Sequence, residues 1–136
     1  MSIKDLVPEP ENLNPFDEWV VVLGASPKRS RYSNQALRLL KAEGYRVIPV
    51  HPKAEEIEQT AVVNDLRAIT GTVHTVTLYV GPSRSLSQID AIIGLKPRRL
   101  IINPGAESTE LERRLNEHEI PYLHGCTLVM LRTGQF

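Results

Sequence analysis

The sequence predicts a single α/β domain in which five short strands form a mostly parallel, doubly wound sheet with helices on both faces. Short apolar runs alternate along the chain with segments of helical periodicity. The apolar runs are nearly continuous, as is typical of strands that are buried on both faces. Each segment of helical periodicity lies between two such runs and supplies the crossover connection that parallel neighbours need.

Five runs rich in apolar and β-branched residues are predicted as strands. Pro52 ends the second of them, because proline donates no ladder hydrogen bond and disfavours helix at the residue before it. The pair Gly81-Pro82 ends the third in the same way. The strands are expected at residues 20–23, 45–50, 73–80, 99–102 and 122–124.

Helices are predicted in the gaps between these strands. Gly44 ends the first, Gly94 and Pro97 mark the end of the second, and residues 108–111 open the third. The third helix carries opposite charges three and four residues apart, which is typical of a solvated face with ion pairs. The helices are expected at 33–43, from Ser83 or Ser85 to 93, and at 108–118, with a short one near 64–69.

Length and composition predict one domain and a short arm. The chain has 136 residues, enough for one core that buries roughly two-thirds of the surface of the unfolded chain. Prolines at positions 8, 10 and 15 predict an extended N-terminal arm over residues 1–17. The folded domain is expected over residues 18–136.

Charge and cysteine content narrow the expected partners and compartment. Sixteen basic and sixteen acidic residues give a formal net charge of zero, so neither nucleic acid nor an anionic membrane is expected as a partner. The single cysteine, Cys126, has no partner for an internal disulfide. Asp5 and Glu9 lie in the N-terminal segment, where a signal peptide would have a basic start followed by an apolar core. We expect a soluble, cytoplasmic protein with a small-molecule ligand; a homodimer or a partner protein stays open.

The stretch after the first strand predicts a phosphate-binding turn. Gly24 permits a close approach or backbone angles that a side chain forbids, and the amides of the helix start near Ser33 carry a partial positive charge. Basic side chains between these positions add positive charge toward a phosphate: Lys28, Arg29 and Arg31. We therefore expect a nucleotide-type ligand that is bound by its phosphates.

Ligands of open α/β sheets bind at the carboxyl edge of the strands, where the strand order reverses. Four loops begin where predicted strands end and combine glycine or proline with small polar residues. They are residues 24–33, 50–53, 80–85 and 103–108. We expect backbone amides to make most of the ligand contacts there.

A dinucleotide-binding fingerprint is incomplete in this chain. It requires three spaced glycines and an acidic residue near the end of the second strand. Gly24 is followed by Ala25, Ser26 and Pro27, and Lys53 follows the second strand and its closing proline. This pattern disfavours NAD but leaves open a ligand with a phosphorylated ribose. An NAD(P)-binding oxidoreductase domain and a ligand-sensing protein-interaction module remain the alternatives.

No catalytic or metal-binding set is expected. Ser26 lacks the second glycine of a nucleophile elbow. His124 and Cys126 point the same way along an extended chain, but no third group orients them. The four histidines show none of the spacings that indicate zinc. We therefore predict binding without catalysis.

Four motifs in order carry a family resemblance: Val-Leu-Gly-Ala-Ser at 22–26, Gly-Tyr-Arg-Val-Ile-Pro-Val-His-Pro at 44–52, Asn-Pro-Gly-Ala-Glu-Ser at 103–108 and Gly-Cys-Thr at 125–127. Over residues 18–132 the chain resembles the small single-domain coenzyme A-binding proteins. Their Rossmann-like fold is similar to the N-terminal nucleotide-binding domain of the succinyl-CoA synthetase alpha subunit. The resemblance implies non-catalytic binding of coenzyme A or acyl-CoA.

The resemblance also implies where the ligand lies. The turn at 24–26 and the basic loop behind it contact the diphosphate, the adenosine lies near His51-Pro52 and Gly81-Pro82, and residues 103–106 face the pantetheine. Members usually have asparagine at the position of His51 and a helical N-terminal segment. Whether Cys126, which the resemblance places near the pocket, is redox-active stays open. The expected CoA-binding residues are Gly24, Ala25, Ser26, Lys28, Arg29, Arg31, Tyr32, Ser33, His51, Pro52, Gly81, Pro82, Asn103 and Gly105.

Overall fold

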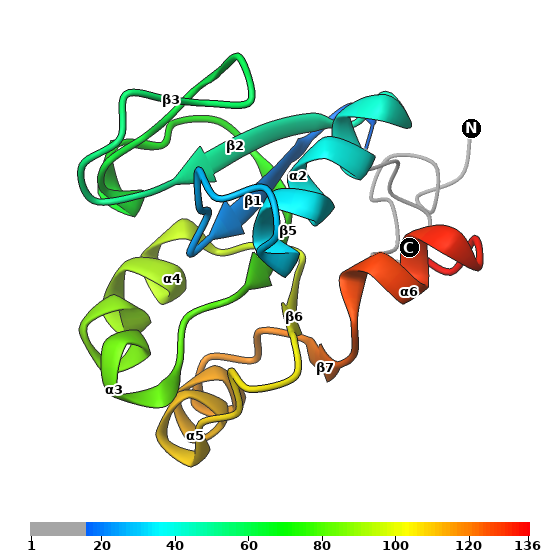
Figure 1. Cartoon of the computed structure of the whole chain (residues 1–136). Helices are drawn as coiled ribbons and strands as arrows, with labels where there is room; N and C mark the ends of the chain where they lie inside the picture. The colour runs from blue at the N-terminus through cyan, green and yellow to red at the C-terminus, as the bar shows by residue number, and fades with distance from the viewer. Residues whose placement is uncertain (1–15) are drawn as a thin grey trace, which may run out of the picture.

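A computed structural model describes residues 16–136 of the chain. The arm predicted for residues 1–17 falls almost entirely outside these residues. The fold is a five-stranded sheet in the order β2-β1-β5-β6-β7, and every neighbouring pair of strands is parallel (Figure 1). The strands are β1 (Trp19–Leu23), β2 (Arg46–Val50), β5 (Val73–Leu78), β6 (Arg99–Ile102) and β7 (Tyr122–His124). The predicted α/β fold with a parallel sheet is confirmed.

Helices cover both faces of the sheet, as predicted. Val20 and Val22 of β1 pack with Leu37 on the face covered by α2 and α6. Val21, on the opposite face of the strand, packs with Ile92 under α4 and α5 (Figure 1). The helices are α2 (Tyr32–Ala42), α3 (Pro82–Ser85), α4 (Ile89–Leu95), α5 (Thr109–Glu117) and α6 (Thr127–Arg132), with the 3₁₀ turns η2 (Leu66–Ala68) and η3 (Leu86–Gln88).

The helix predicted from Ser83 or Ser85 to residue 93 is interrupted. It consists of α3, η3 and α4 in succession. The segment starts with Gly81 as its cap and Pro82 in its first turn, while the Ser85 hydroxyl donates back to the Pro82 carbonyl at 3.1 Å. The helix ends between the two expected breakers, Gly94 and Pro97: α4 continues to Leu95, and its C-terminal cap Lys96 adopts a left-handed φ of 52°.

Two elements were not predicted from the sequence. A two-stranded hairpin joins β3 (Glu56–Ile57) to β4 (Thr60–Ala61). Its two turn residues, Glu58 and Gln59, both have positive φ, as this tight turn requires. Such turns usually contain Asn-Gly, so the Glu-Gln pair gave no sequence signal for a hairpin. The short helix α6 follows β7 and packs against α2.

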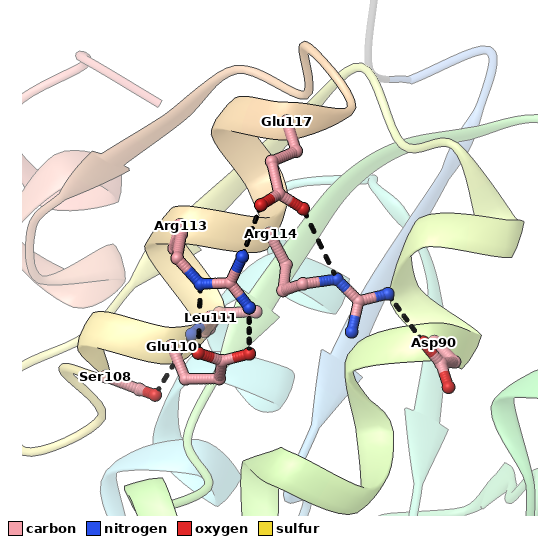
Figure 2. A network of polar contacts seen from close by, with 7 residues as sticks. All are labelled: Asp90, Ser108, Glu110, Leu111, Arg113, Arg114 and Glu117. Carbon is pink, nitrogen blue, oxygen red and sulfur yellow. Dashed lines mark hydrogen bonds and ion pairs between the residues drawn. The ribbon is translucent and has the colours of Figure 1, made fainter.

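The predicted charged face of α5 is confirmed (Figure 2). Ser108 caps the helix by accepting a hydrogen bond from the Leu111 amide at 3.2 Å. Arg113 pairs with Glu110 and Glu117, and its hydrogen bond to Glu110 lowers the pKa of that carboxyl group. Such exposed pairs add little stability individually. Arg114 reaches from α5 to Asp90 on α4 and so links the two helices.

Among residues 16–136, no helix has the length and apolar character needed to cross a membrane.

Candidate functional site

A cleft of about 850 Å³ opens at the carboxyl edge of the sheet. It lies where β1 and β5 end, between the strands at which the sheet order reverses, and this is where open α/β sheets bind ligands. Most of the predicted contact residues line it: Gly24, Ala25, Ser26, Lys28, Arg31, Tyr32, Ser33, His51 and Pro52.

The turn after β1 is held tightly by its neighbours. Gly24 has a φ of +94°, and a Cβ there would lie 3.0 Å from the Val80 side chain and 3.1 Å from the Tyr79 backbone. The Ala25 amide donates to the Val50 carbonyl at 3.1 Å. Glycine at position 24 is therefore required by the adjacent strand end, and the Ala25 amide is already bonded within the fold.

The N-terminal end of α2 provides the free donors at this edge. No side chain caps the helix, and its first turn contains no acidic residue. The amides of Tyr32 and Ser33 therefore lack an intrahelical acceptor, and both residues line the cleft. Lys28 and Arg31 line it too, and neither pairs with a carboxylate in the described part of the chain. This combination favours an anion.

Arg29 has a different position from the other two basic residues of this loop. Its guanidinium pairs with Glu58 at 2.8 Å, at the tip of the β3-β4 hairpin, and it does not line the cleft. The buried Asn34 donates to the Ser26 carbonyl at 2.9 Å and to Glu58 at 3.2 Å, and accepts from Arg38 at 2.8 Å. These contacts hold the loop in shape without a ligand.

His51 has a defined tautomer. Its Nδ1 atom accepts hydrogen bonds from the Lys53 amide at 3.0 Å and the Ala54 amide at 2.9 Å. The proton of the neutral ring therefore sits on Nε2, which is left as a donor. Nδ1 thus makes the same kind of contact that an asparagine side-chain oxygen makes with backbone amides two residues on.

The segment after the β3-β4 hairpin also reaches the cleft, although no sequence pattern indicated it. Val63 pairs alongside Val50 at the end of β2, and the Asn64 side chain donates to the His51 carbonyl at 2.8 Å. Asn64, Asp65 and Arg67 consequently line the cleft. The Asp65 carboxylate accepts from the Arg67 amide at 2.9 Å and so caps η2.

The segment after β5 supplies another wall, from Tyr79 and Val80 to residues of α3 and η3. Burial raises the pKa of Tyr79 to about 12, against a smaller opposing effect of the Thr127 and Thr77 hydroxyls. The Tyr79 oxygen is buried and makes no hydrogen bond in the described part of the chain. The remaining residues of this wall are Ser83, Arg84, Ser87 and Gln88. The first two belong to the predicted ligand loop 80–85, whereas sequence reasoning missed the other two.

Four predicted contact residues, besides Arg29, lie off the cleft lining: Gly81, Pro82, Asn103 and Gly105. Asn103 is buried, and its amide nitrogen donates to Thr77 at 2.8 Å and to the Leu78 carbonyl at 3.0 Å, while its oxygen accepts from the Thr127 amide at 2.9 Å. The Gly105 amide donates to the Glu107 carboxylate at 3.0 Å. Pro104 is the residue of this loop that lines the cleft.

His124 and Cys126 also lie outside the cleft. The His124 ring pairs with Glu112 of α5 at 2.9 Å, and Cys126 is a free cysteine at the start of α6. Over residues 16–136, no three His, Cys, Asp or Glu side chains are grouped as a metal site would need.

Comparisons with known proteins agree with this arrangement. A model of the CoA binding domain family matches residues 18–132. A crystal structure described as an uncharacterized protein is 44% identical, covers 88% of this chain and 98% of its own, and has a TM-score of 0.81. Cell-free ID.343 from Thermus thermophilus is 25% identical over the full length of both chains, also with a TM-score of 0.81.

A larger protein shares the fold alone. The dinucleotide-forming acetyl-coenzyme A synthetase 1 of Ca. Korarchaeum cryptofilum is 23% identical and has a TM-score of 0.69; the match covers 90% of this chain and 27% of the synthetase. A search of curated proteins returns no match.

The match of the family model over nearly the whole described chain confirms the resemblance seen in the sequence motifs, and it supports a CoA-related role. The chain belongs to the CoA binding domain family.

Proposed function

We propose that this chain binds coenzyme A or an acyl-CoA in the cleft and catalyses no reaction of its own. One observation carries the proposal: the cleft combines an uncapped helix start with two basic side chains, Lys28 and Arg31, that pair with no carboxylate among residues 16–136. Membership of the CoA binding domain family supports the choice of ligand.

The diphosphate would occupy the N-terminal end of α2. The amides of Tyr32 and Ser33 donate to its oxygens there, and Lys28 and Arg31 supply the positive charge. Because the loop is already held by Asn34, little ordering is needed when the ligand arrives.

The adenosine would lie against His51 and Pro52, where the Nε2 proton of the histidine is available to an acceptor on the base or the ribose. The pantetheine would then run along the wall formed by Tyr79 and Val80 toward Pro104.

The polar groups in the cleft argue for binding without catalysis. Ser26 supplies a hydroxyl within the turn after β1, and its oxygen accepts from the Lys28 amide at 3.2 Å. The Nδ1 atom of His51 is occupied by two backbone amides. Among the described residues no hydrogen bond joins a hydroxyl to this histidine, as a nucleophile activated by it would need, and this supports binding without catalysis.

Titration calorimetry with coenzyme A, acetyl-CoA, NAD and NADP tests the proposal. We expect heat with the two CoA forms and none with NAD.

Replacing Lys28 and Arg31 together by alanine should weaken CoA binding about tenfold or more at low salt, and less at high salt because exposed charges are screened. The Arg132→Ala variant, in α6 and away from the cleft, is the control. Absence of CoA binding, or tighter binding of NAD, would overturn the proposal.

A further inference from the structure

The cleft contains more positive charge than a diphosphate needs. Four basic side chains line it, against the single carboxylate of Asp65: Lys28, Arg31, Arg67 and Arg84. Lys28 and Arg31 belong to the loop that leads into α2 and are accounted for by the diphosphate. Arg67 and Arg84 come from other elements, η2 and α3, and have no role in that contact.

We propose that Arg67 and Arg84 form a second anionic subsite, which binds the phosphate on the ribose of a coenzyme A-type nucleotide. The inference rests on the proposed function, and it names the group by which the cleft selects its ligand. Coenzyme A carries a phosphate on the 3′ oxygen of its ribose in addition to the diphosphate, and dephospho-coenzyme A does not.

Arg84 is free to take an anion. Its backbone is anchored, because its amide donates to the Gly81 carbonyl at 3.1 Å and its carbonyl accepts from the Ser87 hydroxyl at 3.0 Å. Its guanidinium makes no hydrogen bond or ion pair within residues 16–136. Arginine presents its donors as a planar fork that matches phosphate oxygens two at a time.

Arg67 is only weakly engaged. Its guanidinium lies 3.4 Å from Asp65, and the two side chains are 66% and 55% exposed, so this pair contributes little. The main role of Asp65 is its hydrogen bond to the Arg67 amide, which fixes the backbone of η2. The carboxylate thus holds Arg67 at the cleft and leaves most of its donors available.

The position of η2 points to the ribose end of the ligand. Asn64, three residues before Arg67, donates to the carbonyl of His51, on the wall assigned above to the adenosine. η2 also packs against α4. α4 continues directly from α3 and η3, and Arg84 lies in α3. The two arginines therefore come from adjoining walls of the cleft: Arg67 from the adenosine side, and Arg84 from the segment that follows Val80.

The experiment compares coenzyme A with dephospho-coenzyme A on the full chain. In the parent protein we expect coenzyme A to bind at least about tenfold more tightly, since a charge-assisted contact is lost with the 3′-phosphate. In the Arg67→Gln/Arg84→Gln double variant that preference should fall below about threefold, with the affinity for dephospho-coenzyme A unchanged. Arg132→Gln is the matched control and should keep the full preference.

The outcomes separate this subsite from the proposed function. Equal affinity of the parent protein for both ligands overturns the subsite and leaves CoA binding intact. An equal loss of affinity for both ligands in the double variant also overturns it, because the arginines would then contact a group common to both. Binding of neither ligand to the parent protein overturns the proposed function itself.

Discussion

The loop after β1 and the loop after β6 look alike in sequence, but they differ in whether their polar groups are hydrogen-bonded within the protein. Both begin at the end of a buried strand and combine glycine, proline and small polar residues. The loop after β1 leaves the first amides of α2 and the side chains of Lys28 and Arg31 without a protein partner among the described residues. The loop after β6 bonds Asn103 and the Gly105 amide within the fold.

The difference arises from the segments that meet each loop. The β3-β4 hairpin contacts the first loop through Glu58, which holds its outer residues and leaves its inner side open. The start of α6 meets the second loop directly, because the Thr127 amide donates to the Asn103 side chain. The loop after β1 therefore keeps donors available at the cleft, whereas the loop after β6 uses its side-chain donors and acceptors within the fold.

A loss of hydrogen bonds in the loop after β6 should lower the free energy of unfolding more than a similar loss in the loop after β1. The Asn103→Ala variant leaves the Thr127 amide and the Leu78 carbonyl without this partner in a buried site. We expect a loss of about 3 kcal/mol in the free energy of unfolding, measured by urea denaturation. The exposed Asn116→Ala change in α5 should cost less than about 0.5 kcal/mol. A similar small loss at Asn103 would contradict the assignment of this loop to the fold.

Two glycines with nearly the same backbone angle sharpen the comparison. Gly24 and Gly105 have φ of +94° and +91°, but a Cβ at Gly24 would meet Tyr79 and Val80, whereas one at Gly105 would meet no atom within 4 Å. Gly24→Ala should lower the free energy of unfolding by about 2 kcal/mol and Gly105→Ala by about 1 kcal/mol.

Equilibrium denaturation of the two glycine variants side by side measures this difference. Equal losses would mean that the backbone angle alone determines the cost, and that the close approach of the strand end to Gly24 contributes nothing.

Tyr79 connects the two regions, since it is one of the residues that line the cleft and its hydroxyl lies near Thr77 and Thr127 in the buried network. Its pKa is raised from 10.0 to about 12 by burial, so the unfolded state releases the proton first as the pH rises. The stabilising effect of the neutral folded form is complete below pH 10 and is lost progressively toward pH 12.

The Tyr79→Phe variant tests this titration. It removes an unpartnered buried hydroxyl, so its stability at pH 7 should equal or slightly exceed that of the parent protein. Between pH 10 and 11.5 the parent protein should lose about 1 to 2 kcal/mol relative to the variant. Urea denaturation across this pH range measures the difference, and parallel pH curves for the two proteins would rule out the raised pKa.

The local pattern of the sequence was sufficient to predict the five parallel strands, the helices on both faces and the turn at Gly24. These features depend on short continuous apolar runs, on helical periodicity between them, and on glycine and proline at the ends of elements, all of which act over a few residues. The same reasoning located most of the cleft around residues 24–33 and His51-Pro52.

Only the tertiary structure decided which polar groups remain available to a ligand. Asn34 meets Glu58 across 24 residues of chain, and Thr77 meets Thr127 across 50. Arg67 reaches the cleft because its segment pairs alongside β2. Hydrogen bonds between such distant segments leave no periodic trace in the sequence, because each depends on a partner that folding alone brings within about 3 Å.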